Sequence, residues 1–196
     1  MRPTTSKVGR ALIIGGALAL AYWAYLWSEQ LLFQRAAVRL LEKQLVPAHS
    51  LIHHAGEARD RTNIKPHVGD VVGLLKIPRL RFSVIILEGV GSDILKRAAG
   101  HISGTALPGN MGNVGIAGHR DTLFRPLRDI RANDLIVLET PKGIFRYRVE
   151  RTEVVEPTDV DVLHHTEDAQ LTLVTCYPFY FLGPAPKRFI VHAGQT

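Results

Sequence analysis

Internal disulfide bonds are excluded in this chain, because its 196 residues contain one cysteine, Cys176. No internal repeat and no alternation of strands with long helices is visible, which argues against solenoids and parallel α/β folds. The net charge is +6, but the basic residues are dispersed and accompany no RNA- or DNA-binding motif. We therefore expect no nucleic-acid partner. The length suits one ordinary domain with extra segments, and the single thiol is free to react.

A long uncharged run lies near the N-terminus, from Ala11 to Trp27. It is at the short end of the roughly 17 to 25 residues that cross a bilayer as a helix. Aromatic residues gather at its far end, and Arg2, Lys7 and Arg10 precede it, which favours a cytoplasmic N-terminus. We expect a basic cytoplasmic tail at 1–10 and a single-pass transmembrane anchor in membrane lipid at 11–27. A cleaved signal peptide and a buried core helix are the alternatives.

The segment 28–69 is predicted to connect this anchor to a folded domain. Apolar residues between Leu31 and Leu45 recur at helical spacing until Pro47, which disfavours further helix. The stretch from Pro47 to Gly69 has no sustained period and is typical of a tether. We therefore expect a juxtamembrane helix and tether at 28–69, with the domain at 70–196 outside the cytoplasm.

From Asp70 onward, short β-rich runs alternate with turn residues, which is typical of an antiparallel sandwich or small barrel. The expected strands are Val71–Ile77, Phe82–Leu87, Val114–His119, Leu135–Glu139, Ile144–Val154, Leu171–Cys176 and Arg188–His192. Pro141 and Gly143 predict a hairpin between two of them. Short helices are expected at Ile94–Ala99 and Phe124–Asp129.

Two motifs in this domain carry groups suited to nucleophilic chemistry. Cys176 ends the strand-like run Leu-Thr-Leu-Val-Thr-Cys, and His119 ends the run Gly-Ile-Ala-Gly-His, followed by Arg120. An ordinary thiol is only a few per cent thiolate at neutral pH, so a nucleophilic cysteine needs a base such as histidine nearby. A small buried hydrophobic residue is the alternative use of a free cysteine. The sequence separation alone does not show that the two residues meet.

These motifs, together with Arg188 beyond the cysteine, resemble a sortase of the class D type. The resemblance extends over roughly Asp70 to Gly194. It implies a mainly β fold, a closed eight-stranded β-barrel with a few short helices, in which His119, Cys176 and Arg188 form one site. The stretch from Pro47 to Gly69 contains no Asp-Pro dipeptide resembling the lid of pilin-polymerising sortases. That absence favours a housekeeping-like or single-substrate role.

The resemblance implies a cysteine transpeptidase. Cys176 attacks a threonine carbonyl in a sorting signal of the Leu-Pro-x-Thr type, and His119 protonates the leaving amine. In sortases an arginine about twelve positions after the cysteine stabilises the developing negative charge, and Arg188 occupies that place. Asp121, on the same strand face as His119, is a weaker candidate for orienting the imidazole.

The expected partners are a secreted protein with a Leu-Pro-x-Thr-like C-terminal sorting signal and an amine acceptor of the cell envelope. Ala117, Val174 and Thr175 are predicted to bind the substrate, in a groove bordered by about Val160 to Asp168. We expect no cofactor and no metal, because neither the histidine groups nor the few acids near Glu167 match a recognised ligand pattern.

Two rival functions use the same sequence features. A cysteine endopeptidase would let water resolve the thioester, although papain-like and caspase-like signatures are absent around Cys176. A non-enzymatic, anchored β-barrel binding module would keep Cys176 only as a core residue.

Overall fold

The computed structural model describes residues 9, 12–18, 20–23, 66–181 and 183–196. Residues 12–18 and 20–23 are helical and exposed. Within the described part of the chain, no helix has both the length and the apolarity needed to cross a membrane. The predicted tail, anchor, juxtamembrane helix and tether lie wholly or partly outside the described residues.

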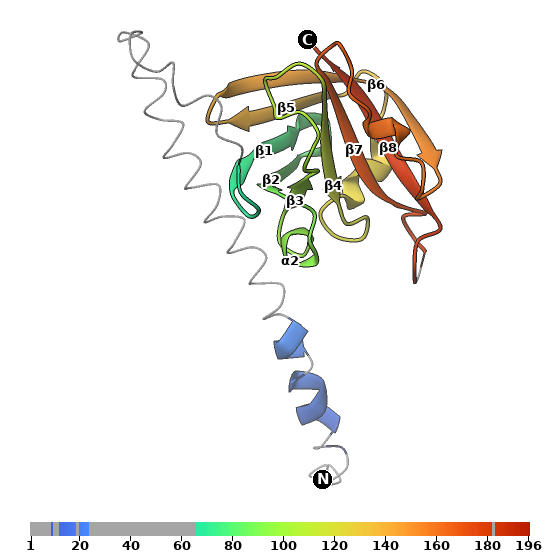
Figure 1. The fold of residues 1–196 in the computed structure, drawn as a ribbon. Helices are drawn as coiled ribbons and strands as arrows, with labels where there is room; N and C mark the ends of the chain where they lie inside the picture. The colour runs from blue at the N-terminus through green and yellow to red at the C-terminus, as the bar shows by residue number, and fades with distance from the viewer. Residues whose placement is uncertain (1–8, 10–11, 19, 24–65, 182) are drawn as a thin grey trace.

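The folded domain is a closed barrel of eight strands, in the order β1-β2-β3-β4-β7-β8-β6-β5 (Figure 1). This confirms the predicted barrel. Two neighbouring pairs, β2–β3 and β4–β7, are parallel, and the other pairs are antiparallel. The strands are β1 (Val71–Ile77), β2 (Phe82–Glu88), β3 (Ala99–His101), β4 (Asn113–Gly118), β5 (Leu135–Thr140), β6 (Gly143–Val155), β7 (Gln170–Tyr177) and β8 (Lys187–Gln195).

The short helices differ from the prediction, which did not include η1 (Pro78–Leu80) and η3 (Asp161–Leu163) and which extended a helix from Ile94 to Ala99. The expected helix Ile94–Ala99 is split into α2 (Ser92–Leu95) and the short strand β3, which the sequence did not reveal. β3 contains no β-branched residue, and it forms because its backbone pairs with β2 and β4. The other helical pieces are single 3₁₀ turns: η1 (Pro78–Leu80), η2 (Arg125–Asp129), which corresponds to the predicted helix Phe124–Asp129, and η3 (Asp161–Leu163).

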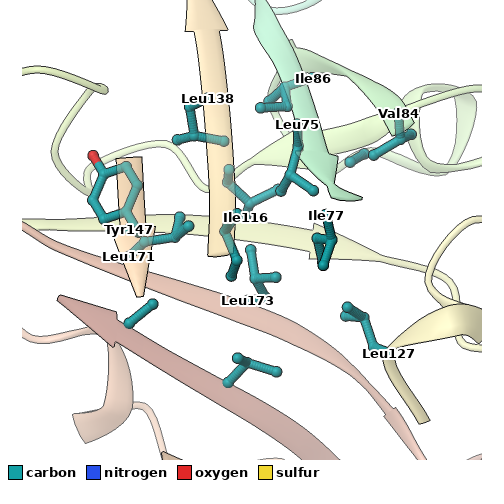
Figure 2. Packing of buried hydrophobic residues seen from close by; sticks show 14 of the residues in the cluster. Leu75, Ile77, Val84, Ile86, Ile116, Leu127, Leu138, Tyr147, Leu171 and Leu173 are labelled. Atoms are coloured by element: carbon teal, nitrogen blue, oxygen red, sulfur yellow. The ribbon is translucent and has the colours of Figure 1, made fainter. Parts of the chain in front are cut away.

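The barrel interior is filled by aliphatic side chains that alternate along the strands (Figure 2). On β7, for example, Leu171 and Leu173 are fully buried and point into the same core as Ile116 of β4. Each buried side chain of this size contributes roughly 1.5–3 kcal/mol through the hydrophobic effect. The opposite face of β4, β7 and β8 is thereby left to form the outer surface of the barrel, where the candidate site lies.

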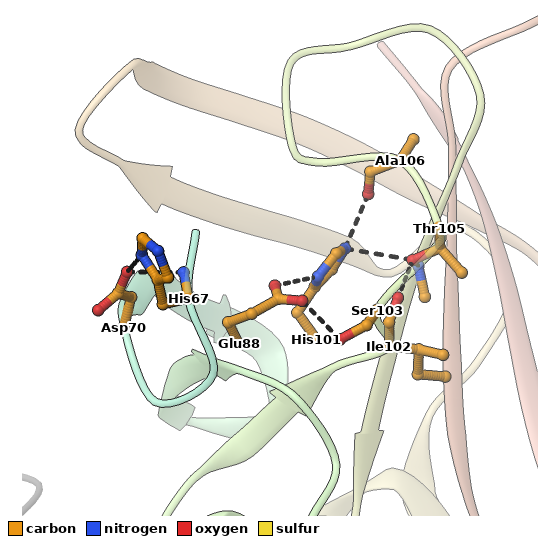
Figure 3. A network of polar contacts seen from close by, with 9 residues as sticks. His67, Asp70, Glu88, His101, Ile102, Ser103, Thr105 and Ala106 are labelled. Atoms are coloured by element: carbon orange, nitrogen blue, oxygen red, sulfur yellow. Dashed lines mark hydrogen bonds and ion pairs between the residues drawn. The ribbon is translucent and has the colours of Figure 1, made fainter. Parts of the chain in front are cut away.

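A buried polar network supports the β3–β4 loop, residues 102–112 (Figure 3). His101 Nδ1 lies 2.6 Å from Glu88 Oε2, and Ser103 Oγ donates to Glu88 Oε1 at 2.6 Å. His101 Nε2 donates to the Ala106 carbonyl at 2.9 Å, since that oxygen can only accept. The hydroxyl of Thr105 accepts the Gly115 N–H at 3.0 Å, which fastens the loop to β4.

Candidate active site

The strands β4, β7 and β8 are consecutive neighbours in the barrel wall (Figure 1). β4 and β7 are parallel with Gly118 opposite Thr175, so His119, directly after β4, lies level with Cys176. β7 and β8 are antiparallel, with Cys176 opposite Arg188. Neighbouring strands are about 4.8 Å apart. The three residues selected from sequence therefore lie on adjacent strands at one end of the barrel, where β4 and β7 end and β8 begins.

His119 is held in place through its backbone. Its carbonyl accepts the Phe124 N–H at 2.9 Å, which closes a turn after β4. The preceding residue must be small, because a Cβ at Gly118 would lie 2.7–2.9 Å from three atoms of the Phe124 ring. The Gly118 carbonyl also accepts the Thr175 hydroxyl at 2.8 Å, which links the end of β4 to β7. The imidazole itself is partly exposed.

Cys176 is a free, half-buried thiol on the outer face of β7. Val174 shares that face, is also half-buried and stands opposite Ala117 of β4, so two of the predicted substrate-binding residues border the same surface. Thr175 points the other way. It is 2% exposed and donates its hydroxyl to Gly118, so its side chain supports the strand pair and is placed apart from the other two.

Arg188 reaches from the start of β8 into the β7–β8 loop, residues 178–186. Its Nη1 donates to the Lys187 carbonyl at 3.0 Å and to the Ala185 carbonyl at 3.4 Å. Both bonds start from one nitrogen, so the guanidinium retains N–H donors on Nη2 and Nε that can meet a substrate oxygen. A planar, permanently charged donor beside a thiol suits the stabilisation of an oxyanion.

The β6–β7 loop, residues 156–169, covers the outer face of β4 and β7 at the end remote from Cys176. Asn113 Nδ2 donates to the Val162 carbonyl at 3.0 Å, and its Oδ1 accepts the Thr172 hydroxyl at 2.8 Å. Leu163 lies over β4 so closely that a Cβ at Gly115 would be 3.1 Å from Leu163 Cδ2. The predicted groove border, Val160 to Asp168, thus lies on the same face as Cys176.

Beside this loop is a polar cleft of about 360 Å³, whose lining includes Asn113, Glu153, Asp161, His164 and His192. The Glu153 carboxylate accepts bonds from Arg151 at 2.6 Å and from His192 Nε2 at 2.7 Å. The Arg151 hydrogen bond lowers the pKa of Glu153, and burial lowers the pKa of His192. At neutral pH the cleft therefore presents a carboxylate and a neutral imidazole. Among the described residues, no group of three or more His, Cys, Asp or Glu could hold a metal ion.

The β7–β8 loop accepts hydrogen bonds from two arginines, Arg120 and Arg128, that were not selected from the sequence. Arg120, next to His119, is 8% exposed, and its Nη2 donates to the carbonyls of Phe181 at 2.8 Å and Gly183 at 2.9 Å. Arg128 Nη1 donates to the Tyr180 hydroxyl at 2.6 Å. The position of Arg120 beside the histidine was the only available signal, since local sequence does not show which arginines are buried.

Asp121, the weaker candidate for orienting the imidazole, is exposed.

Comparison with known proteins gives a consistent result. A family model described as "Sortase domain" matches residues 75–196. Sortase D of Bacillus subtilis (strain 168) is 33% identical over 160 residues, which cover 81% of this chain and 80% of that protein. Sortase A of Listeria monocytogenes is 31% identical over 110 residues, 54% of this chain and 49% of that protein. A solved Clostridium perfringens Sortase D5 transpeptidase has a TM-score of 0.64 and 30% identity, covering 79% of this chain and 97% of that chain.

Proposed function

Because this chain belongs to the sortase family of cysteine transpeptidases, we propose that it cleaves a Leu-Pro-x-Thr-type sorting signal and joins the new carboxyl end to an amine. The catalytic residues in this proposal are Cys176, His119 and Arg188. The observation that supports it is the register of β4, β7 and β8, in which His119 follows the residue opposite Thr175 and Cys176 is opposite Arg188.

The first half-reaction forms a thioester. The Cys176 thiolate attacks the threonine carbonyl carbon, a C–S bond forms, and the carbonyl oxygen becomes an oxyanion that accepts N–H bonds from Arg188. The oxyanion then collapses and the C–N bond to the next residue breaks. His119, as imidazolium, gives its proton to the departing amine.

The second half-reaction restores the enzyme. An incoming primary amine attacks the thioester carbon and loses a proton to the His119 imidazole, and the C–S bond breaks to regenerate the thiolate. One peptide bond is exchanged for another, so no net oxidant, reductant or cofactor is consumed.

The signal would lie along the outer face of β4 and β7. Ala117 and Val174 border that face near the thiol, and the β6–β7 loop borders its far end. The proline of such a signal has a fixed backbone angle, so a shaped groove binds it at lower cost in conformational entropy. Thr175 contributes to this surface only indirectly, through its bond to Gly118.

The proposal includes a single-pass membrane anchor at residues 11–27, with the basic tail in the cytoplasm and residues 70–196 outside. Its support is the uncharged run from Ala11 to Trp27, its terminal aromatic residues and the preceding Arg2, Lys7 and Arg10. The substrate would be a secreted protein carrying the sorting signal, and the acceptor an amine of the cell envelope. Reaction of externally added, membrane-impermeant thiol reagent with Cys176 in intact cells tests this orientation.

A peptide-exchange assay tests the chemistry. The full chain is incubated with pentapeptides Leu-Pro-x-Thr-Gly and Leu-Pro-x-Thr-Ala and with a set of primary amines, and products are identified by mass spectrometry. We expect a mass shift of Cys176 equal to the Leu-Pro-x-Thr acyl group, and a new amide with at least one amine. Cys176→Ala should remove both, and Arg188→Ala should slow thioester formation by roughly 10²–10³-fold.

The same assay separates the rival functions. Hydrolysis without amide formation, at saturating concentrations of every amine, would identify a cysteine endopeptidase. If small electrophiles fail to alkylate Cys176 in the folded chain and no peptide is cleaved, the enzyme proposal is wrong and a binding module remains.

A further inference from the structure

Arg120 connects the turn after β4 to the β7–β8 loop. It directly follows His119, and its Nη2 donates to two carbonyls of the β7–β8 loop, those of Phe181 and Gly183. Its guanidinium carbon also lies 5.9 Å from the centre of the Phe181 ring, within the range of a cation–π contact. One side chain thus connects the turn after β4 to the loop that leads into β8.

Barrel stability does not account for an arginine at this position. Among the described residues its guanidinium contacts two backbone carbonyls and one ring, with no carboxylate, and Nη1 is buried without a hydrogen-bond partner. Burying a charge without a counter-charge is unfavourable, and an apolar side chain of similar shape is often equally or more stabilising. The residue is therefore better explained by what it holds in place.

The segment that Arg120 holds is also the one that Arg188 contacts. Arg188 Nη1 donates to the Ala185 carbonyl, two positions beyond Gly183, whose carbonyl accepts from Arg120. Gly183 has a φ of +104°, a conformation that other residues rarely adopt, so glycine suits the turn between these two bonded carbonyls. Because the two accepting carbonyls are only two residues apart, we expect a shift of the backbone at Gly183 to move the Ala185 carbonyl that Arg188 contacts.

We propose that Arg120 is a positioning residue for thioester formation: it fixes the β7–β8 loop against the end of β4, and the loop sets the place of the Arg188 guanidinium beside Cys176. This inference rests on the proposed function. Arg120 touches neither the thiol nor the substrate in this role and acts through Arg188. Displacement of a catalytic group by about 1 Å can cost roughly 10²-fold in rate, so loss of this contact has a measurable effect.

A double-mutant cycle tests the proposal on the full chain with the best peptide of the exchange assay. The variants are Arg120→Met, Arg120→Lys, Arg188→Ala and the combination of Arg120→Met with Arg188→Ala. Arg148→Met is the matched control, because Arg148 also donates to a backbone carbonyl, that of Asn133, but from an exposed position on β6. Thioester formation, KM, the unfolding midpoint and the rate of Cys176 alkylation by iodoacetamide are measured for each.

Arg120→Met should lower the rate constant of thioester formation by about 10- to 100-fold, with KM within about threefold. Alkylation of Cys176 should stay within about twofold of the unsubstituted chain, since the thiol and His119 are held by other contacts. Lysine should restore part of the rate relative to Arg120→Met, because its ammonium keeps the charge and can donate to a carbonyl. The double variant should be no slower than Arg188→Ala, and the control should match the unsubstituted chain.

Two results would overturn the inference while leaving the proposed function intact: an unchanged rate in Arg120→Met, or a double variant whose loss equals the product of the two single losses. If Arg120→Met does not fold, the same cycle with Arg120→Lys decides between coupling and independence. Failure of the unsubstituted chain to form a thioester would instead contradict the proposed function.

Discussion

The two loops that flank β7 are fastened to the barrel by different chemistry. The β6–β7 loop is bonded to β4 by a neutral group, the Asn113 amide, which donates to the carbonyls of Val162 and His164, while its ion pair between Glu156 and Lys187 is exposed. The β7–β8 loop is held by the guanidinium groups of Arg120 and Arg128. In the proposed function this difference would separate two roles: the neutral end would border the peptide, and the charged end would position the groups around the thiol.

Two glycines of β4 provide the strongest test of this division. A Cβ at Gly118 would meet the rigid Phe124 ring at 2.7–2.9 Å, whereas a Cβ at Gly115 would meet the flexible side-chain ends of Leu163, Thr105 and Ile102 at 3.1–3.2 Å. Gly118→Ala should displace His119 and lower the rate constant for thioester formation by roughly 10²-fold. Gly115→Ala should mainly raise KM. Equal effects of the two substitutions on the rate constant would argue against separate roles for the two ends.

The second prediction concerns the neutral end. Asn113→Ala removes the amide that joins the β6–β7 loop to β4 and β7, and it leaves the buried Thr172 hydroxyl without that partner. We expect a higher KM with little change in the rate constant, and a loss of about 1–3 kcal/mol in the free energy of unfolding. Denaturant unfolding and steady-state kinetics measure the two effects.

Thr172→Val is the matched control, since it keeps the shape of the side chain and removes the hydroxyl while leaving the bond from Asn113 to the Val162 carbonyl in place. Its effect on KM should be smaller than that of Asn113→Ala. A large fall in the rate constant with either variant would show that this end also places the catalytic groups.

The smallest expected effect comes from the ion pair of Arg79 and Asp134, which contacts the end of η2. Arg79 hydrogen-bonds Asp134 through two nitrogens and donates to the Asp129 carbonyl at the end of η2, the turn that carries Arg128. The Arg79 hydrogen bond holds the pKa of Asp134 below its usual range. A lowered carboxyl pKa stabilises the fold above the unfolded value of about 3.9, and this contribution is lost as the pH falls through the folded value.

Asp134→Asn should therefore lower the thermal midpoint at pH 7, and the difference from the unsubstituted chain should shrink as the pH falls below about 4. Asn113→Ala, as the neutral comparison, should give a difference that changes little over the same range. A constant difference for Asp134→Asn would mean that the carboxylate charge does not contribute to this support.

Most of the fold could be predicted from the sequence because its strands are marked by β-branched and aromatic residues between turn signals. β1 begins and ends at the predicted residues, and the hairpin at Pro141 to Gly143 joins β5 to β6. β3 could not be predicted, because Ala99, Gly100 and His101 have little strand preference of their own. Their pairing depends on β2 and β4, which are distant in sequence.

The candidate site shows the same limit. His119, Cys176 and Arg188 were selected because their motifs resemble those of sortases, and the strand register brings the three positions together. The residues that hold the two loops, Arg120 and Asn113, could not be found in this way. Arg120 and Asn113 act through burial and through bonds to loop carbonyls, and no local pattern distinguishes them from surface residues. Thr175 was assigned to the substrate surface, but the alternation of β7 turns its side chain inward.

The parallel pairing of β4 with β7 has a practical consequence. The hairpin of β5 and β6 lies between His119 and Cys176 along the chain, while the strands that carry the two residues are neighbours in the barrel. A chain cut at the turn between Thr140 and Gly143 would yield two fragments, one with the proposed base His119 and the other with the proposed nucleophile Cys176. Neither fragment could catalyse alone, so recovery of activity on mixing would report reassembly, and the cut chain would serve as a split-enzyme sensor of proximity.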